Sequence, residues 1–505
     1  MRDIHAIVHG PSHKWWALGT VSTGVFMSTL DAGVVAVSLP TIMTQFNASV
    51  DMIQWIVLAY LATITVTLLP FGRLADMYGR KQVYTLGFVI FTLGSALCGA
   101  SGSTMQLALF RALQALGAAM LMANGMAITS AVFPARERGK ALGINGTVVA
   151  TGTTVGPTVG GLLTQWLGWR SIFYINIPVG IVGVTMAILV LRNSEVTPSL
   201  AAGRRPKFDL AGALIAAAGL LALLLALTGG EELGLPGSTT WLFYAAAAFI
   251  LVGFVLVERR VREPIIDLSL FRLKLFALGS SAGLLTFLAV SANAFLMPFY
   301  LQLILHYPPS QAGLLMTPTS LVIAVVAPLS GWLSDRLGAR LLSSLGLSVV
   351  CLALFSLSRL NTASGYHDVL LRLVLLGLGQ GMFQSPNNSS VIGAVPRERY
   401  GVAGGFLSMM RNLGMVMGTA LASSLLMSGL VQTVGHVNLA TLGQAGAVGN
   451  SSLIDGFMVG MERAYLVAAI LAASGVLASL SRGGSFHKGG AAVAPKEPRY
   501  QTTKR

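Results

Sequence analysis

The chain has 505 residues, of which 54% are hydrophobic and only 10% charged, and its mean hydropathy is +0.74. Soluble proteins carry about 25% charged residues, so this composition excludes an ordinary soluble domain and indicates an integral membrane protein. The formal net charge of +15 is explained by a basic face against anionic lipid, and it requires no nucleic-acid partner.

The apolar stretches follow one another as fourteen segments. Each is long enough to cross a bilayer as a helix, which needs about 20 apolar residues. The residues before the first segment show no signal-peptide cleavage pattern, so we expect that segment to be retained. The segments lie near 15–40, 52–71, 82–101, 105–132, 141–163, 170–191, 209–228, 240–257, 276–303, 311–333, 341–358, 368–395, 402–429 and 462–481.

The positions of lysine and arginine orient these segments. Short cytoplasmic loops retain positive charge, and most of the 33 basic residues fall on one side when both termini are placed inside. The opposite loops near 43–51, 229–239 and 430–459 contain no lysine or arginine. The sequence therefore predicts a multi-pass plasma (inner) membrane protein with both termini in the cytoplasm.

The chain contains an internal repeat. GRLADMYGRKQV (72–83) returns as GWLSDRLGARLL (331–342), and the Arg-Glu-Arg of 136–138 returns at 397–399 with nearly the same separation. Arg111 and Arg372 are separated by a similar length of chain, as are two pairs of glycines. We therefore expect six spans to be repeated in the same orientation, with two further spans inserted between the repeats.

This organisation predicts five regions. A cytoplasmic segment (1–14) precedes a first six-helix bundle (15–192), and a linker with two inserted spans (193–275) leads to a second bundle (276–481). The tail (482–505) is polar and rich in glycine and proline, so we expect it to be disordered. Such repeated halves suit a transporter that rocks around a central site.

Four motifs resemble those of the major facilitator superfamily, and specifically its fourteen-span drug:proton antiporter family. They read LDAGVVAVSLP (30–40), GRLADMYGRK (72–81), RALQALGAA (111–119) and GTTVGPTVGG (152–161). Ala36 stands where that family commonly has asparagine, and Ala115 replaces a glycine. The resemblance implies an all-α membrane fold of fourteen transmembrane helices, in which two six-helix bundles flank two extra helices. It also implies a multidrug efflux pump that works by alternating access.

Asp31 is the acidic residue that we place most securely inside a span. A charged side chain at the centre of a bilayer costs about 2.5–3.5 kcal/mol by insertion scales. Counting residues places Asp31 and Arg111 roughly 12 Å and 9 Å from the same membrane boundary, so the two can form an ion pair. Burial favours the protonated form of the carboxyl, whereas the arginine favours the ionised form. We interpret the pair as a proton-coupling site; the alternative is a permanent structural ion pair.

The loop motif and its repeat predict a charged latch on the cytoplasmic face. Asp76 is placed to meet the N-terminal end of a helix that begins near Gly401, and Arg80 is expected to pair with Glu137. The alternative is a generic turn that merely retains positive charge. The predicted gate residues are Gly72, Asp76, Gly79, Arg80, Glu137, Asp335, Arg336, Arg340 and Glu398.

The antiporter motif combines small residues with a proline inside one span. Proline removes a backbone donor and bends a helix, while glycines allow close approach of a second helix. We interpret this span as a seal against proton leak between the two halves, the alternative being simple helix packing. Its residues are Gly152, Gly156, Pro157, Gly160 and Gly161.

Further polar and methionine residues within the spans are candidates for a substrate cavity, or for hydrogen bonds and packing between helices. They are Gln114, Asn124, Asn145, Asn293, Gln380, Gln384, Met409 and Arg411. With one embedded acid, we favour lipophilic monocations or neutral amphiphiles as substrates. Hydrolase, zinc-protease and phosphate-loop motifs are absent from the sequence, so we expect no enzyme, no metal and no cofactor.

The partners expected are the bilayer, protons and a lipophilic small molecule, and we expect the protein to act as a monomer. Two other functions remain open from the sequence. One is a lipid or fatty-acid exporter or flippase of the same fold, and the other, more distant, is a membrane sensor that does not transport.

Overall fold

A computed structural model describes residues 12–134, 136–192, 210–227, 240–259, 268–396, 400–434 and 451–482. Throughout this part of the chain the regular structure is helical, and a helix coincides with each of the fourteen predicted spans. The long helices are α2 (His13–Phe46), α3 (Val50–Tyr78), α4 (Arg80–Ala100), α5 (Thr104–Val132), α6 (Arg138–Leu167), α8 (Asn176–Val190), α11 (Leu210–Leu227), α12 (Thr240–Glu258), α13 (Lys274–Phe299), α14 (Pro309–Leu337), α15 (Ala339–Leu357), α16 (Tyr366–Gly393), α17 (Tyr400–Val434) and α19 (Ser451–Leu480). Short elements are α7 (Ser171–Tyr174), η3 (Leu268–Arg272) and the π-helical η4 (Tyr300–Ile304).

Eleven helices within the described residues are long and apolar enough to cross a membrane. The other three predicted spans correspond to α6, α11 and α16. Glycines and polar residues lower the apolar content of α6 and α16, while α11 is highly apolar but short in the part described. The chain is therefore a multi-pass membrane protein with an all-helical fold.

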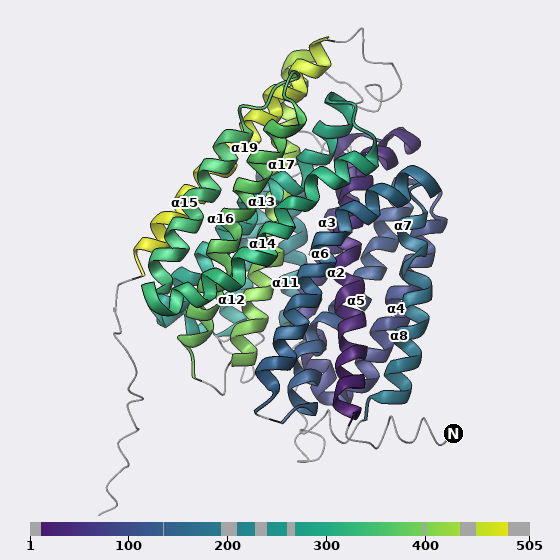
Figure 1. The fold of residues 1–505 in the computed structure, drawn as a ribbon, viewed down its shortest axis with the longest axis vertical. Helices are drawn as coiled ribbons and strands as arrows, with labels where there is room; N and C mark the ends of the chain where they lie inside the picture. Colours follow the sequence, from purple (N-terminus) through teal and green to yellow (C-terminus); the bar gives the residue numbers. More distant parts are fainter. Residues whose placement is uncertain are drawn as a thin grey trace, which may run out of the picture.

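The helices repeat one packing pattern in two sets, α2–α8 and α13–α19. In the first set α2 packs on α6, and both α3 and α4 pack on α5. In the second set α13 packs on α17, and both α14 and α15 pack on α16. Figure 1 shows the first set in purple to blue and the second in green to yellow. This equivalence agrees with the internal repeat found in the sequence.

The two sets meet mainly through two helix pairs, α6 with α14 and α3 with α17, and to a smaller extent through α2 with α13 and α14. Helices α11 and α12 pack on each other, and α11 also touches α3 and α17 from outside. The inserted pair therefore lies beside the junction of the two sets, where it adds apolar cover without entering either repeat.

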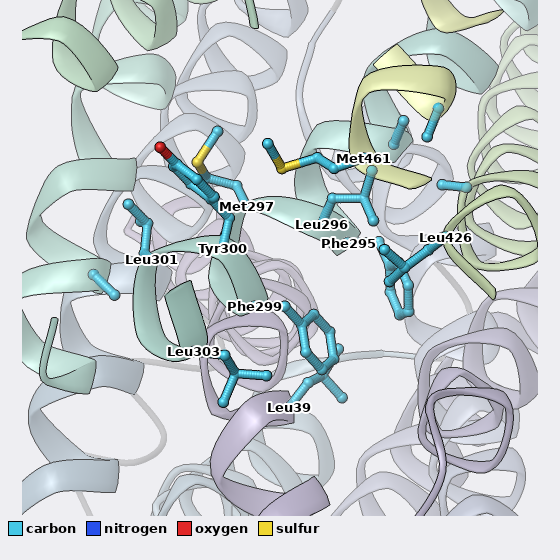
Figure 2. Packing of buried hydrophobic residues seen from close by; sticks show 14 of the residues in the cluster. Leu39, Phe295, Leu296, Met297, Phe299, Tyr300, Leu301, Leu303, Leu426 and Met461 are labelled. Atoms are coloured by element: carbon cyan, nitrogen blue, oxygen red, sulfur yellow. The ribbon is translucent and has the colours of Figure 1, made fainter. Parts of the chain in front are cut away.

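The largest apolar cluster crosses from one set to the other. Leu39 of α2 lies beside Phe299 and Leu303, at the junction of α13 and η4 (Figure 2). All three side chains are almost fully buried. We call the end of the molecule where η4 lies the Gln302 end, and the opposite end, where α4 begins, the Arg80 end.

The predicted loop over 430–459 is partly wrong. Helix α17 continues to Val434 and α19 begins at Ser451, so regular structure extends into that range from both sides. Residues 435–450 lie outside the described residues, as do the tail beyond Arg482 and the predicted outer loop 229–239.

Candidate functional site

Asp31 lies at the centre of a closed polar cluster inside the first set of helices. Its side chain has no exposed surface. One carboxylate oxygen, Oδ2, accepts a 2.5 Å hydrogen bond from Arg111 Nη1. The other, Oδ1, accepts bonds of 2.9 Å from Gln114 Nε2 and of 2.9 Å from Asn176 Nδ2. The carboxylate is thus ionically paired and held by donors from two further side chains.

Arg111 is held as firmly as its partner. Its Nε donates to the carbonyl oxygen of Ile56 at 3.3 Å, and Nη1 also reaches Gln114 Oε1 at 2.6 Å. The guanidinium carbon lies 3.9 Å from the centre of the Tyr60 ring, a distance at which a cation is attracted to the aromatic face. Helices α2, α3, α5 and α8 therefore contribute directly to the contacts of this single charge pair.

The structure supplies a polar partner that the sequence did not indicate. Ala36 replaces the asparagine that the resembling family often has in the first span, but Asn176, at the start of α8, donates to Asp31 instead. Gln114 belongs to the same cluster, where it also donates to Ser95 Oγ at 2.8 Å. Gln114 is therefore part of the charge network, and its amide is committed to that network in this structure.

Within the described residues, the second set of helices has no equivalent charge pair. Arg372 occupies the position that repeats Arg111, but it pairs with Asp368 one turn away on its own helix, at 3.0 Å. Helix α13, which repeats α2, contains no acidic residue. Among the described residues, the buried ion pair is found only in the first set, and this asymmetry marks Asp31 and Arg111 as the candidate functional site.

The glycines of the antiporter motif bring α6 against two helices. A β-carbon built at Gly156 would lie 3.0 Å from Gly33 Cα, and one at Gly160 would lie 2.7 Å from Val34 Cα, both on α2. A β-carbon at Gly161 would lie 2.2 Å from the carbonyl oxygen of Pro309, at the start of α14. These distances are far below van der Waals contact, so side chains larger than glycine would force the helices apart.

The other two motif residues complete this arrangement. A β-carbon at Gly152 would lie 2.2 Å from Thr29 Oγ1, and one at Gly313 would lie 2.2 Å from the carbonyl oxygen of Pro157. Helix α6 is therefore packed between α2 of its own set and α14 of the other set. Helix α6 therefore links α2 to the junction between the sets.

Hydrogen bonds between the two sets of described helices gather towards the Gln302 end. Gln302 Nε2 donates to the carbonyl oxygen of Val37 at 2.7 Å, and Thr41 Oγ1 donates to Gln302 Oε1 at 3.5 Å. The hydroxyls of Thr158 and Thr317 lie 2.5 Å apart. Gln165 Oε1 accepts from the backbone N–H of Ser310 at 3.2 Å. Together with the apolar cluster of Figure 2, these bonds close that end.

The predicted pair between Arg80 and Glu137 is wrong in this structure. Arg80 Nη2 pairs with Asp76 at 2.9 Å, whereas Glu137 pairs with Lys14 at 2.5 Å. Lys14 rather than Arg80 pairs with Glu137 because the start of α2 lies directly beside the turn that contains Glu137. Glu137 therefore ties α2 to the loop before α6.

The glycines of the loop motif differ in what they do. Gly79 has a φ of +109°, a backbone conformation that favours glycine, and it separates α3 from α4. Gly338 has a φ of +89° at the equivalent turn of the second set. Gly72 lies in an unstrained helix, where a β-carbon would touch only Ala123 Cβ, at 4.0 Å.

The repeated gate residues of the second set are largely exposed. Asp335, Arg336 and Arg340 all lie near the turn between α14 and α15, and Arg336 stacks 4.1 Å from the ring centre of Trp332. They form no ion pair with one another in the part of the chain that the structure describes. Glu398 and its two flanking arginines lie outside the described residues.

The remaining substrate candidates fall into two groups. Asn124, Asn145 and Asn293 are buried and bonded within their own sets, to Met120 O, to Thr129 and Ser22, and to Tyr465, respectively. In the second group the side chains are half-buried: Gln380, Gln384, Met409 and Arg411.

Helical geometry places three members of this second group towards the interior. Gln380 and Gln384 share a face of α16, between positions that contact α13 and α14. On α17, Arg411 lies nearly opposite Leu413, which packs beside the peripheral helix α11. Neither the two glutamines nor Arg411 has a hydrogen-bonding or ionic partner among the described residues, so all three are available to a bound molecule.

Comparison with known proteins identifies the class. Residues 21–419 match the family model described as "Major Facilitator Superfamily", and the chain belongs to this superfamily of membrane transporters. The chain is similar to the riboflavin transporter RibZ of Clostridioides difficile, at 39% identity over 81% of this chain and 88% of the relative. It is also similar to the multidrug resistance protein Stp of Mycobacterium tuberculosis, at 37% identity over 81% and 75%.

A solved structure supports the same fold. A bacterial homologue of the human lysosomal transporter Spinster, in an inward-facing and occupied conformation, superposes with a TM-score of 0.67. The match covers 94% of this chain and 97% of that one, at 16% identity. Membership of a transporter superfamily confirms that the protein is not an enzyme.

Proposed function

We propose that the protein is a proton-coupled exporter of lipophilic or amphiphilic small molecules that works by alternating access. The observation that carries the proposal is the buried Asp31–Arg111 pair on a helix that also forms the junction between the two sets. The carboxylate contacts α5 and α8 through one face of α2. Gly33 and Val34, within one turn of Asp31, contact α6 on another face.

Protonation of Asp31 is the proposed driving event. A proton on the carboxyl cancels the attraction to Arg111 and turns an acceptor into a donor, so the network around Asp31 must rearrange. Removing one charge of a buried pair costs about 3–5 kcal/mol, which is enough to shift an equilibrium between two conformations. Because α6 packs directly on α2, that rearrangement is transmitted to the contacts of Gly161 and Thr158 with α14.

The proposed topology has fourteen transmembrane helices, with two bundles over 15–192 and 276–481 and an inserted pair between them. We propose that the Arg80 end faces the cytoplasm, because basic residues gather there and lysine and arginine are retained on the cytoplasmic side. The closed Gln302 end then faces outward, as an inward-facing conformation requires. The protein is proposed to act as a monomer in the inner membrane.

The proposed substrate pathway lies between the two sets, and its polar lining supports a broad substrate class. Gln380 and Gln384 present amide donors and acceptors, and Arg411 presents donors only. Relatives named for riboflavin transport and for multidrug resistance support a planar or amphiphilic compound as substrate.

Transport into proteoliposomes with an acidic interior tests the proposal. We expect purified protein to accumulate ethidium or riboflavin against its concentration gradient, and a proton ionophore to abolish this accumulation. Protein-free liposomes are the control. If neither probe moves but a labelled phospholipid crosses the bilayer, the protein is a lipid exporter of the same fold. If neither the probes nor the phospholipid moves while the protein stays folded, the proposal is wrong.

A further inference from the structure

A second buried arginine lies far from the Asp31 site. Arg482 lies two residues beyond the end of α19 and is only 6% exposed, and its Nη2 donates to Asn387 Oδ1 on α16 at 2.5 Å. Among the described residues, its Nε and Nη1 are buried without a hydrogen-bond partner, and so is Asn387 Nδ2. Three donor atoms at one position are therefore left without acceptors in the described part of the chain.

The charge on Arg482 is also unbalanced. Burial lowers the pKa of Arg482 to about 10, so the guanidinium remains positive at neutral pH. The described residues provide no carboxylate within 4.0 Å of it, in contrast to Arg111. An uncompensated charge away from water costs several kcal/mol, so a counter-charge at this position would stabilise the fold.

Gly283 on α13 leaves room for an occupant beside Asn387. A β-carbon at Gly283 would meet only Asn387 Nδ2, at 3.6 Å, and is otherwise in open space. One turn earlier, Gly279 is closely packed, because a β-carbon there would lie 2.3 Å from Val391 Cγ2, and it would also lie 3.6 Å from Arg482 Cζ. The open space on the side of α13 that faces these groups therefore lies at Gly283.

The chemistry of the unpaired atoms selects an anion. Guanidinium N–H and amide NH₂ groups are donors only, so the occupant must be an acceptor, and the positive charge requires it to be negative. Arginine binds phosphate and similar oxyanions through several N–H groups at once. Exposed Arg272, at the end of η3, and exposed Lys274, at the start of α13, add positive charge at the same end of the second set.

We propose that Arg482 and Asn387 form a binding site for a phosphate-type anion between α13, α16 and α19. The anion is either free phosphate or the headgroup of an anionic phospholipid at the membrane surface. An occupant that bonds both side chains ties the end of α19 to α16, within the second set. This site is independent of the proposed transport function and of the proton at Asp31.

Thermal unfolding of the purified full-length protein tests the site. One arm compares phosphate with chloride at equal ionic strength, and the other compares phosphatidylglycerol with phosphatidylcholine in mixed micelles. We expect the unfolding temperature to rise by several degrees with the anion. A response to phosphate identifies a free anion, and a response to phosphatidylglycerol alone identifies a lipid headgroup. If neither raises the unfolding temperature, the site does not exist.

Three variants sharpen the test. Arg482→Leu removes the unpaired charge, so it should abolish the response and raise the unfolding temperature in anion-free buffer. Asn387→Asp supplies an internal counter-charge, so it should do the same with both side chains still present. Arg272→Leu, an exposed charge at the same end, should respond like the wild type. An anion response in Arg482→Leu or Asn387→Asp equal to that of the wild type would overturn the proposal.

Discussion

Replacement of Gly161 by alanine should open the closed end of the transporter. The new β-carbon would lie 2.2 Å from the carbonyl oxygen of Pro309 and 3.0 Å from Ser310 Cα, where ordinary contacts begin at 3.4 Å. Helices α6 and α14 must therefore separate by about 1 Å, and such overpacking costs about 1–3 kcal/mol. If that cost falls only on the conformation closed at the Gln302 end, its population relative to the alternative drops roughly 5- to 150-fold.

Cross-linking between the two sets measures this shift. Cysteines at Thr158 and Thr317, whose hydroxyls lie 2.5 Å apart, report closure through a short bifunctional thiol reagent. The native Cys98 and Cys351 are free and are first replaced by serine. We expect Gly161→Ala to slow cross-linking strongly.

The matched control for this experiment is Gly146→Ala. It lies on the same helix, but its β-carbon meets nothing within 4 Å, so it should cross-link like the wild type. Equal cross-linking in both variants would refute the reasoning from the α6–α14 contact.

Two further variants test the closed end and the loop motif. Gln302→Ala removes the bond to the Val37 carbonyl, worth about 1 kcal/mol, so the same cross-link should form several-fold more slowly; an unchanged rate would show that the bond does not hold the end closed. Gly79→Ala places a residue with a β-carbon at a backbone φ of +109°, which is strained, so it should lower the unfolding temperature. Gly72→Ala, with only Ala123 nearby, should not. A larger loss in Gly72→Ala would contradict the strain argument.

The helices and the central charge pair were predictable from the sequence. In a membrane, a long apolar segment has few ways other than a helix to hydrogen-bond its backbone N–H and C=O groups. The positions of the spans therefore follow from composition alone. Asp31 and Arg111 could be paired because both lie at a comparable depth from the same boundary, and the structure confirms their contact.

The partners of that pair were less accessible to sequence reasoning. Asn176 lies at the start of its span, where asparagine is common as a residue that ends or begins a helix. Only the packing of α8 on α2 brings its side chain to Asp31. From the sequence, Gln114 is a candidate both for substrate binding and for hydrogen bonds between helices, because its distance to Asp31 depends on the rotation of α5 about its axis.

Local charge patterns failed for a related reason. Arg80 and Glu137 have opposite charges on neighbouring loops, but Lys14 at the start of α2 lies closer to Glu137 and forms the pair. Which of several basic residues reaches an acid depends on distances of a few ångströms between helix ends. Sequence spacing does not resolve such distances.

The central claim is that the proton on Asp31 drives uphill transport. Its most direct test compares the wild type with Asp31→Asn in proteoliposomes, using a probe that the wild type accumulates. Asparagine keeps the size and some of the hydrogen bonds of the site but cannot exchange a proton. Each protein is measured twice, first for accumulation driven by a pH gradient, and then for exchange of labelled against unlabelled probe without a gradient.

The account predicts that Asp31→Asn loses gradient-driven accumulation and retains exchange, because substrate passage survives while the coupling to protons is removed. Accumulation by Asp31→Asn equal to that of the wild type would contradict the account and would leave the buried pair as a structural link between α2 and α5.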